Sequence, residues 1–138
     1  MQIKDIKRFY QSLQKSIVLA KKMQEKVNEL HQVSLTMNGE KTMLLNEQVN
    51  ILLRELALLH QYREKISRKY KIVEENFTLF LIKKMPQAYQ KKVLIKANEL
   101  KKLITSCRAQ VNEHTEMLIK QKEIVESSIK DIGLQIKA

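Results

Sequence analysis

Three histidines and one cysteine are the residues of this chain best suited to metal binding or nucleophilic chemistry. They are His31, His60, His114 and Cys107. A carboxylate-bridged metal site in a helical bundle uses a glutamate three residues before a histidine on the same helix face. Asparagine, alanine and valine stand at those three positions here. We therefore predict no metal site and no cofactor, and we expect the histidines to be partly exposed residues of helix faces.

Cys107 is the only candidate nucleophile of the thiol type. A catalytic cysteine needs a nearby base and donors that stabilise an oxyanion. The chain has only two isolated glycines and no glycine-rich phosphate loop, so it offers few places for such groups. Because Cys107 continues an apolar row between Leu100 and His114, we predict a small buried hydrophobic side chain. We predict no catalytic residue and expect that the protein is not an enzyme.

The densest basic run is the one feature that suggests binding to nucleic acid. It consists of Arg63, Lys65, Arg68, Lys69 and Lys71. Clustered basic residues attract phosphate through counterion release, but glutamates interrupt this run. The pattern favours a solvated face with ion pairs four residues apart. The net charge of +11 is spread along the chain, so it favours acidic partners without identifying nucleic acid.

The composition predicts long helices. The 138 residues include two glycines and one proline, far below the averages of about 7% and 5%. A single cysteine allows no internal disulfide, which fits a reducing cytoplasm. No stretch reaches the roughly 18 apolar residues of a membrane span, and the amphipathic start does not resemble a secretory signal. We expect a cytoplasmic location.

A heptad pattern runs from Leu45 to Phe80. Its positions, in alternating steps of four and three, are Leu45, Val49, Leu52, Leu56, Leu59, Arg63, Ile66, Tyr70, Val73, Phe77 and Phe80. Such a pattern predicts a helix over about 40–84 packed along another helix. Between Ile51 and Leu59 the helix is apolar nearly all round, which predicts two or more neighbours there.

Arg63 is the polar exception in this pattern. Its side chain could extend outward and keep its charge in water, which is the interpretation the sequence favours. Alternatively, it could meet a carboxylate from a partner helix and fix the register of packing.

Two further helices are predicted, over about 3–36 and 87–132. The apolar row of the first is Ile3, Ile6, Tyr10, Leu13, Ile17, Ala20, Met23, Val27 and Leu30. Asn38-Gly39 predicts a turn, with Asn38 able to cap the second helix. Pro86 separates the second helix from the third. We predict a single all-α domain over 1–138, an antiparallel bundle of about three long helices with coiled-coil-like packing.

The apolar stripe of the third helix narrows towards its C-terminus. One row stays apolar, at Ala97, Ile104, Val111, Leu118, Val125 and Ile132. The other row, Val93, Leu100, Cys107, His114, Gln121 and Ser128, is polar from His114 onward. We predict that residues 87–112 belong to the core. The part over 114–132 is expected to extend from the bundle, to exchange its amide hydrogens fast and to be available for a partner.

Three stretches together resemble the FlgN family of flagellar export chaperones. After the first helix and its glycine turn comes Glu40-Lys41-Thr42-Met43-Leu44-Leu45, and after the proline come leucine-spaced residues from Leu94 to Leu103. The resemblance is best in Val111-Asn112-Glu113-His114-Thr115-Glu116-Met117-Leu118-Ile119. Length and three-helix layout agree with the family over nearly the whole chain.

The resemblance implies a cytoplasmic chaperone of type III secretion. It would keep hook-associated proteins unassembled and deliver them to the export machinery, binding its protein client mainly through the C-terminal helix. In this sequence the corresponding partner-binding residues are Val111, Asn112, Met117, Leu118, Ile119, Val125 and Ile129. Apolar anchors at helical spacing fit helix-in-groove binding.

A structural role is the alternative that the sequence leaves open. The chain would then be a coiled-coil scaffold or stalk subunit of a secretion apparatus or another assembly, held by permanent partners. Self-association is compatible with both interpretations, whereas neither a nucleic-acid partner nor a membrane span is expected.

Overall fold

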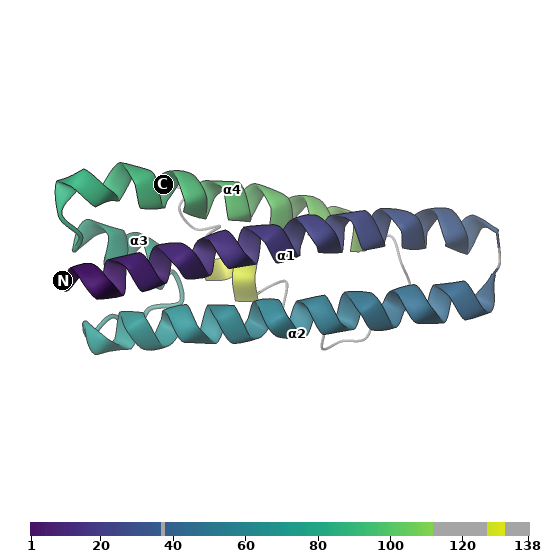
Figure 1. Cartoon of the computed structure of the whole chain (residues 1–138), viewed down its shortest axis with the longest axis horizontal. Helices are drawn as coiled ribbons and strands as arrows, with labels where there is room; N and C mark the ends of the chain where they lie inside the picture. Colours follow the sequence, from purple (N-terminus) through teal and green to yellow (C-terminus); the bar gives the residue numbers. More distant parts are fainter. Residues whose placement is uncertain (37, 112–126, 132–138) are drawn as a thin grey trace.

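The protein is an all-α bundle in which successive long helices run antiparallel. The computed structural model describes residues 1–36, 38–111 and 127–131, and Figure 1 shows their arrangement. The helices are α1 (Ile3–Leu35), α2 (Gly39–Lys69), α3 (Phe77–Lys83) and α4 (Gln87–Val111), followed by a helical turn at residues 127–131. These described residues contain no strand. The predicted all-α bundle is confirmed.

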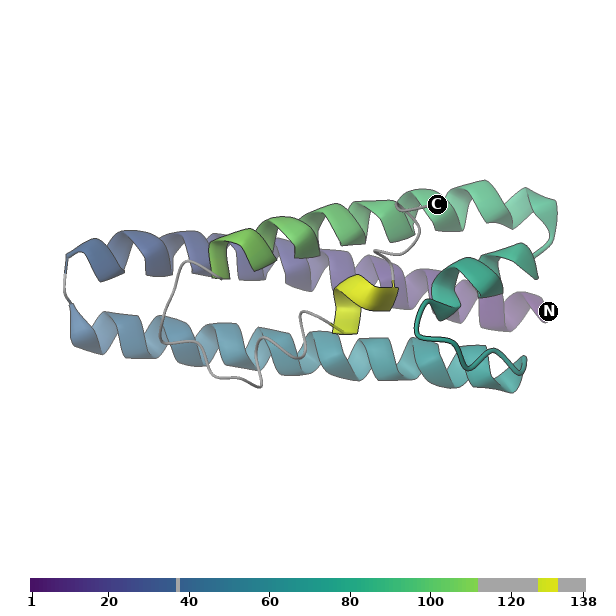
Figure 2. The same cartoon turned by 180° about the vertical axis from the view of Figure 1, so that it is seen from behind.

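α1 is the central helix, with α2 on one side and α4 on the other. Among the described residues, no Cα atom of α2 lies within 8 Å of a Cα atom of α4. The short α3 and the turn at 127–131 lie between these two helices, as Figure 2 shows from behind. α3 closes one end of this space, and the turn occupies its middle.

The apolar rows predicted for the first and third helices form most of the core. In α1 the buried apolar residues are Ile6, Phe9, Leu13, Ile17, Ala20, Met23, Val27, Leu30 and Val33. Ile3 is exposed, so the buried row begins at Ile6, and Phe9 is buried at the place predicted for its half-buried neighbour Tyr10. In α4 the buried row is Val93, Ala97, Leu100, Ile104 and Cys107. The burial predicted for Cys107 is thereby confirmed.

Asn38 starts α2 as a cap. Its Oδ1 accepts a hydrogen bond of 3.2 Å from the backbone N–H of Lys41, which satisfies one of the unpaired first-turn donors. Gly39 has no positive φ and is the first residue of the helix. The cap was predicted correctly, whereas the positive φ typical of an Asn-Gly turn is not used.

The predicted single helix over 40–84 is wrong, because the chain leaves helical geometry between Tyr70 and Asn76. Lys71 has a φ of 62°. The N–H of Lys71 bonds to the carbonyl of Arg68, and the N–H of Ile72 bonds to the carbonyl of Ser67. This pair of bonds is the Schellman motif, in which the residue after the helix cap adopts the left-handed conformation. Val73 of the predicted row is therefore exposed, and Ile72 is buried instead.

The predicted helix over 87–132 is also wrong as a single straight element. α4 is described to Val111, and residues 112–126 lie outside the described part. A helix continued from Val111 would carry residue 131 about 30 Å beyond the end of α4. Asp131 instead bonds to Thr78 in the first turn of α3. The turn at 127–131 therefore packs back against the bundle.

Candidate functional site

The predicted partner-binding residues fall mostly outside the described residues. This applies to Asn112, Met117, Leu118, Ile119 and Val125, for which the prediction stays a prediction. Val111 is the last residue of α4. Ile129 is half-buried and packs against the main hydrophobic core. Of the seven residues, Ile129 is thus placed inside the bundle, where it is not an exposed anchor.

Arg63 lies in the interior of the bundle and does not extend into water. It is only 2% exposed. Its Nη1 donates to the carbonyl of Ser12 at 3.2 Å and to the hydroxyl oxygens of Ser12 and Ser16, at 3.0 and 2.6 Å. The favoured sequence interpretation of Arg63 is therefore wrong. The alternative was a carboxylate from a partner helix, whereas the direct hydrogen-bond partners are serines of α1.

Asp131 brings a second buried charge to the same region. Its Oδ1 accepts the backbone N–H of Thr78 at 3.1 Å, and its Oδ2 accepts the Thr78 hydroxyl at 2.8 Å. Burial raises the pKa of Asp131 to about 6, although the Thr78 bonds and the charge of Arg63 oppose the shift. Burial also lowers the pKa of Arg63 to about 10, which the charge of Asp131 partly offsets. The two charges stabilise one another in a poorly solvated place.

His60 completes this buried polar cluster, which we define as Ser12, Ser16, His60, Arg63, Thr78 and Asp131. The Nδ1 of His60 lies 3.8 Å from Oδ2 of Asp131, and its ring contacts Phe77. Burial and then the charge of Arg63 lower the pKa of His60 to about 4. His60 is therefore neutral at pH 7. Its contact with Asp131 is not an ion pair at that pH, and the charge balance rests on Arg63.

Two surface residues of the basic run form ion pairs, and one of these pairs has the four-residue spacing that the sequence predicted. Arg68 lies 3.4 Å from Glu64 one turn earlier, and Lys69 lies 2.8 Å from Asp5 of α1. Tyr70 donates a short hydrogen bond to the same carboxylate of Asp5. The bond from Lys69 and then that from Tyr70 lower the pKa of Asp5. With Arg63 buried and two further residues paired, this run does not present a continuous cationic surface.

Chemistry-bearing residues do not gather elsewhere in the described part of the chain. No group of three or more histidine, cysteine, aspartate or glutamate residues is placed there to bind a metal. Burial raises the pKa of Cys107 to about 11, so its thiol is protonated at pH 7. None of the helices described is long and apolar enough to cross a membrane.

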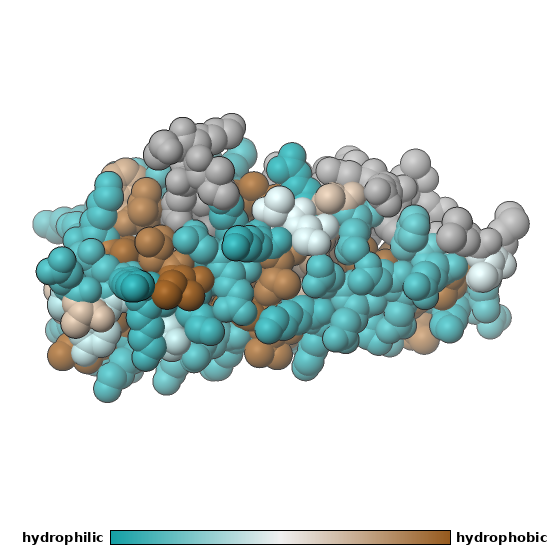
Figure 3. Space-filling model, turned by 90° about the horizontal axis from the view of Figure 1, so that it is seen from above, coloured by the Kyte–Doolittle hydropathy of each residue, from teal (hydrophilic) through white to brown (hydrophobic). Residues whose placement is uncertain are grey.

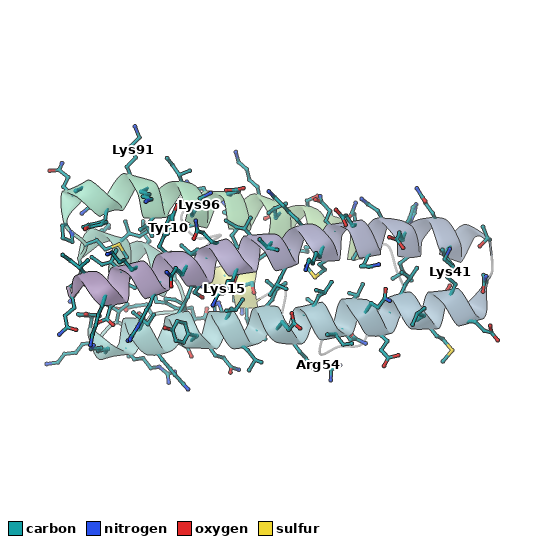
Figure 4. The ribbon with its side chains drawn as sticks, viewed as in Figure 1. Tyr10, Lys15, Lys41, Arg54, Lys91 and Lys96 are labelled. Carbon is teal, nitrogen blue, oxygen red and sulfur yellow. The ribbon has the colours of Figure 1, made fainter. Side chains whose placement is uncertain are left out.

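A shallow apolar groove runs along the junction of α1 and α2 on the outer surface. Its larger hollow has a volume of about 490 Å³. The lining residues are Lys15, Val18, Leu19, Glu55, Leu58 and Leu59. Figure 4 shows Lys15 at this junction, whereas Arg54 points away from it. We call this feature the α1/α2 groove.

Sequence reasoning missed four members of the buried cluster: Ser12, Ser16, Thr78 and Asp131. A signal was present for the serines, because they stand four residues apart on the face of α1 that carries the apolar row. Small polar residues at such positions indicate a polar partner opposite. Thr78 and Asp131 carry no comparable signal, since their contact joins residues 53 positions apart.

Comparisons with protein-family models, with curated proteins and with solved structures found no match to this chain.

Proposed function

We propose that this protein is a non-enzymatic cytoplasmic chaperone that binds helical segments of export clients. It resembles the FlgN-type chaperones of flagellar hook-associated proteins, and it would keep such clients unassembled until type III secretion. The resemblance supplies the identity of the client class. The structure supports the proposal through the way in which the bundle accommodates an additional helical segment.

The observation that carries the proposal is the position of residues 127–131. α2 and α4 both pack on α1 but not on each other, and this helical turn lies in the space between them (Figure 2). Ile129 contacts the main core there, and Asp131 is buried. The bundle thus has an interior face that accepts a short helix from outside its three long helices. A client helix bound in a groove would likewise bury its apolar face against an apolar surface of the bundle.

The proposal is tested by reconstitution with a hook-associated protein of the same organism. The mixture is analysed by size-exclusion chromatography with light scattering, and polymerisation of the client is followed separately. We expect a complex of equal stoichiometry and an arrest of client assembly. A chain that forms no such complex and self-associates instead would favour the alternative of a structural coiled-coil subunit.

The predicted client site is tested by replacing Met117, Leu118 and Ile119 with aspartate. We expect loss of client binding, because the apolar anchors are removed. Val73→Asp is the matched control, since Val73 is 77% exposed in the segment between α2 and α3. Point substitutions are preferable to a chain ending at Gln110. Such a truncation also removes Asp131 and Ile129 from the bundle, so that a loss of binding would have two explanations.

A further inference from the structure

α2 carries a second apolar row that α1 does not cover. It consists of Leu44, Ile51 and Leu58, which are 55%, 44% and 64% exposed. The three residues are seven positions apart, so they lie on one face of the helix, and the row spans about 21 Å. The sequence predicted two or more neighbours for the stretch between Ile51 and Leu59. In the structure the outward side of this stretch faces solvent.

The apolar row continues into the α1/α2 groove. Val18 of α1, which is 53% exposed, lines the same hollow as Leu58. A smaller adjoining hollow of about 160 Å³ shares Lys15 and Leu59 with the first and extends to Tyr62. The groove is therefore elongated along the helix axes. An elongated apolar groove at a helix–helix junction has the shape that accepts a third helix.

The α1 side of the groove is basic. Arg8, Lys15 and Lys22 are exposed and stand seven residues apart along α1. Arg8 and Lys15 line the hollows, and Lys22 lies one turn beyond Val18. Within the described part of the chain, none of the three forms an ion pair. Among the residues that the structure describes, Glu55 is the one acidic residue that lines these hollows.

We propose that the α1/α2 groove binds an amphipathic helix of a partner protein that carries acidic side chains along one edge of its apolar face. The apolar residues of the partner contact Val18, Ile51 and Leu58. Its acidic edge lies along Arg8, Lys15 and Lys22, so acidic residues about seven positions apart are expected. A second copy of this chain fits less well, because a net charge of +11 on each copy opposes their approach.

This surface is separate from the space that residues 127–131 occupy. The groove lies on the outer side of the α1/α2 pair, whereas residues 127–131 lie between α2 and α4 (Figure 2). Because the inference rests on the residues of the groove alone, it does not depend on the chaperone proposal. On the face seen from above in Figure 3, hydrophobic side chains lie in small scattered groups among hydrophilic ones. A short interface with a charged edge is expected to be weak and to weaken further with salt.

The test uses two synthetic helical peptides of about 21 residues with leucines at heptad spacing. One has glutamates along one edge of the leucine face, and the other has lysines at the same positions. Binding to the full chain is measured by fluorescence anisotropy. We expect the glutamate peptide to bind at least tenfold more tightly than the lysine peptide. Equal binding of the two peptides would overturn the proposal.

The apolar floor is tested with Ile51→Gln combined with Leu58→Gln. Both side chains are exposed, so the bundle is expected to keep its helical content and melting temperature. The glutamate peptide should bind this variant at least tenfold more weakly. Ile95→Gln is the matched control, because Ile95 is 55% exposed on α4. An equal loss in the control, or no loss in the groove variant, would contradict the assignment.

The basic edge is tested by charge reversal with Lys15→Glu combined with Lys22→Glu. We expect the preference to invert, so that the lysine peptide binds more tightly than the glutamate peptide. Arg54→Glu combined with Lys91→Glu changes the net charge equally at residues that point away from the groove (Figure 4). This control should keep the original preference. Sedimentation equilibrium is run on the free chain. A dimer abolished by the Ile51→Gln and Leu58→Gln substitutions would assign the groove to a second copy and overturn the partner proposal.

Discussion

Asp131 accepts two hydrogen bonds from one residue, Thr78, which precedes it by 53 positions. The backbone N–H of Thr78 bonds to Oδ1 at 3.1 Å, and the hydroxyl bonds to Oδ2 at 2.8 Å. Thr78 lies in the first turn of α3, where backbone N–H groups have no partner within the helix. Asn76, at the cap position, makes no side-chain cap bond. Asp131 therefore caps α3 and ties residues 127–131 to the bundle.

Thr78→Val is predicted to lower the free energy of unfolding by about 1–2 kcal/mol. The substitution keeps the shape of the side chain and removes the hydroxyl that donates to a buried carboxylate, a bond stronger than one between neutral groups. The change is measured by urea denaturation followed by circular dichroism. Thr105→Val is the control, since Thr105 is exposed in α4. Equal stability of the Thr78→Val variant and the unmodified chain would show that the hydroxyl bond contributes nothing.

The helices that pack by simple repetition were predictable from sequence, and the contacts that close the bundle were not. The buried faces of α1 and α4 follow the apolar periodicity from Ile6 to Leu30 and from Val93 to Cys107. Each such residue is specified by its near neighbours in sequence. The contact between Thr78 and Asp131 depends on where two segments far apart in the sequence pack together. Local sequence periodicity does not predict such a contact.

The pH dependence of stability is predicted to be nearly flat between pH 4 and 6, because two buried groups oppose each other. The folded pKa of His60 is about 4, below its usual value of 6.5, so protonation of His60 destabilises the folded state as the pH falls through this range. The folded pKa of Asp131 is about 6, above its usual value of 3.8. The folded state therefore binds a proton at Asp131 more tightly than the unfolded state does, so acidification through this group stabilises the folded state. Each effect amounts to about 3 kcal/mol at most.

Single substitutions are expected to separate these two effects. In Asp131→Asn the contribution of His60 remains, so the chain should lose stability as the pH falls from 6.5 to 4. In His60→Gln the contribution of Asp131 remains, and stability should rise as the pH falls from 6 to 4. Urea denaturation at several pH values, expressed relative to the unmodified chain, cancels the other titrating groups. Parallel curves for both variants would contradict the assigned pKa directions.

Arg63→Met is predicted to lower the free energy of unfolding by about 3 kcal/mol. The change removes the donor that bonds to Ser12 and Ser16, and it leaves the carboxylate of Asp131 without its nearby positive charge. Losing one member of a buried charge pair is costly, because the other charge stays poorly solvated. Chemical denaturation measures the loss. Arg54→Met, at an exposed position of α2, is the control and should change stability little.

A double-mutant cycle separates the role of the charge from that of the hydrogen bonds. In the Asp131→Asn background there is no carboxylate to compensate, so Arg63→Met should cost at least about 1 kcal/mol less than in the unmodified chain. Additive effects of the two substitutions would mean that Arg63 acts through the serines alone. The sequence had placed the Arg63 side chain in water. Burial of a charge in a heptad position becomes predictable only when its partners on the facing helix are known.

Lys71→Gly is predicted to raise the free energy of unfolding by about 0.5–1 kcal/mol. Lys71 has a φ of 62°, in the left-handed region that costs an ordinary residue about 1–2 kcal/mol and glycine very little. Part of this gain is offset because glycine is more flexible in the unfolded chain. The break after Lys69 was missed in the sequence for the same reason, since no glycine or proline marks it and the heptad pattern continues through it. Thermal and urea denaturation measure the change.

Val73→Gly provides the matched control for that substitution. Val73 lies in the same connecting segment and is 77% exposed, but its φ is not positive. Glycine there adds freedom to the unfolded chain and relieves no backbone strain, so stability should fall slightly or stay the same. A loss of stability in both variants would mean that the left-handed conformation of Lys71 carries little cost. A gain confined to Lys71→Gly would assign that cost to the end of α2, where the predicted long helix is interrupted.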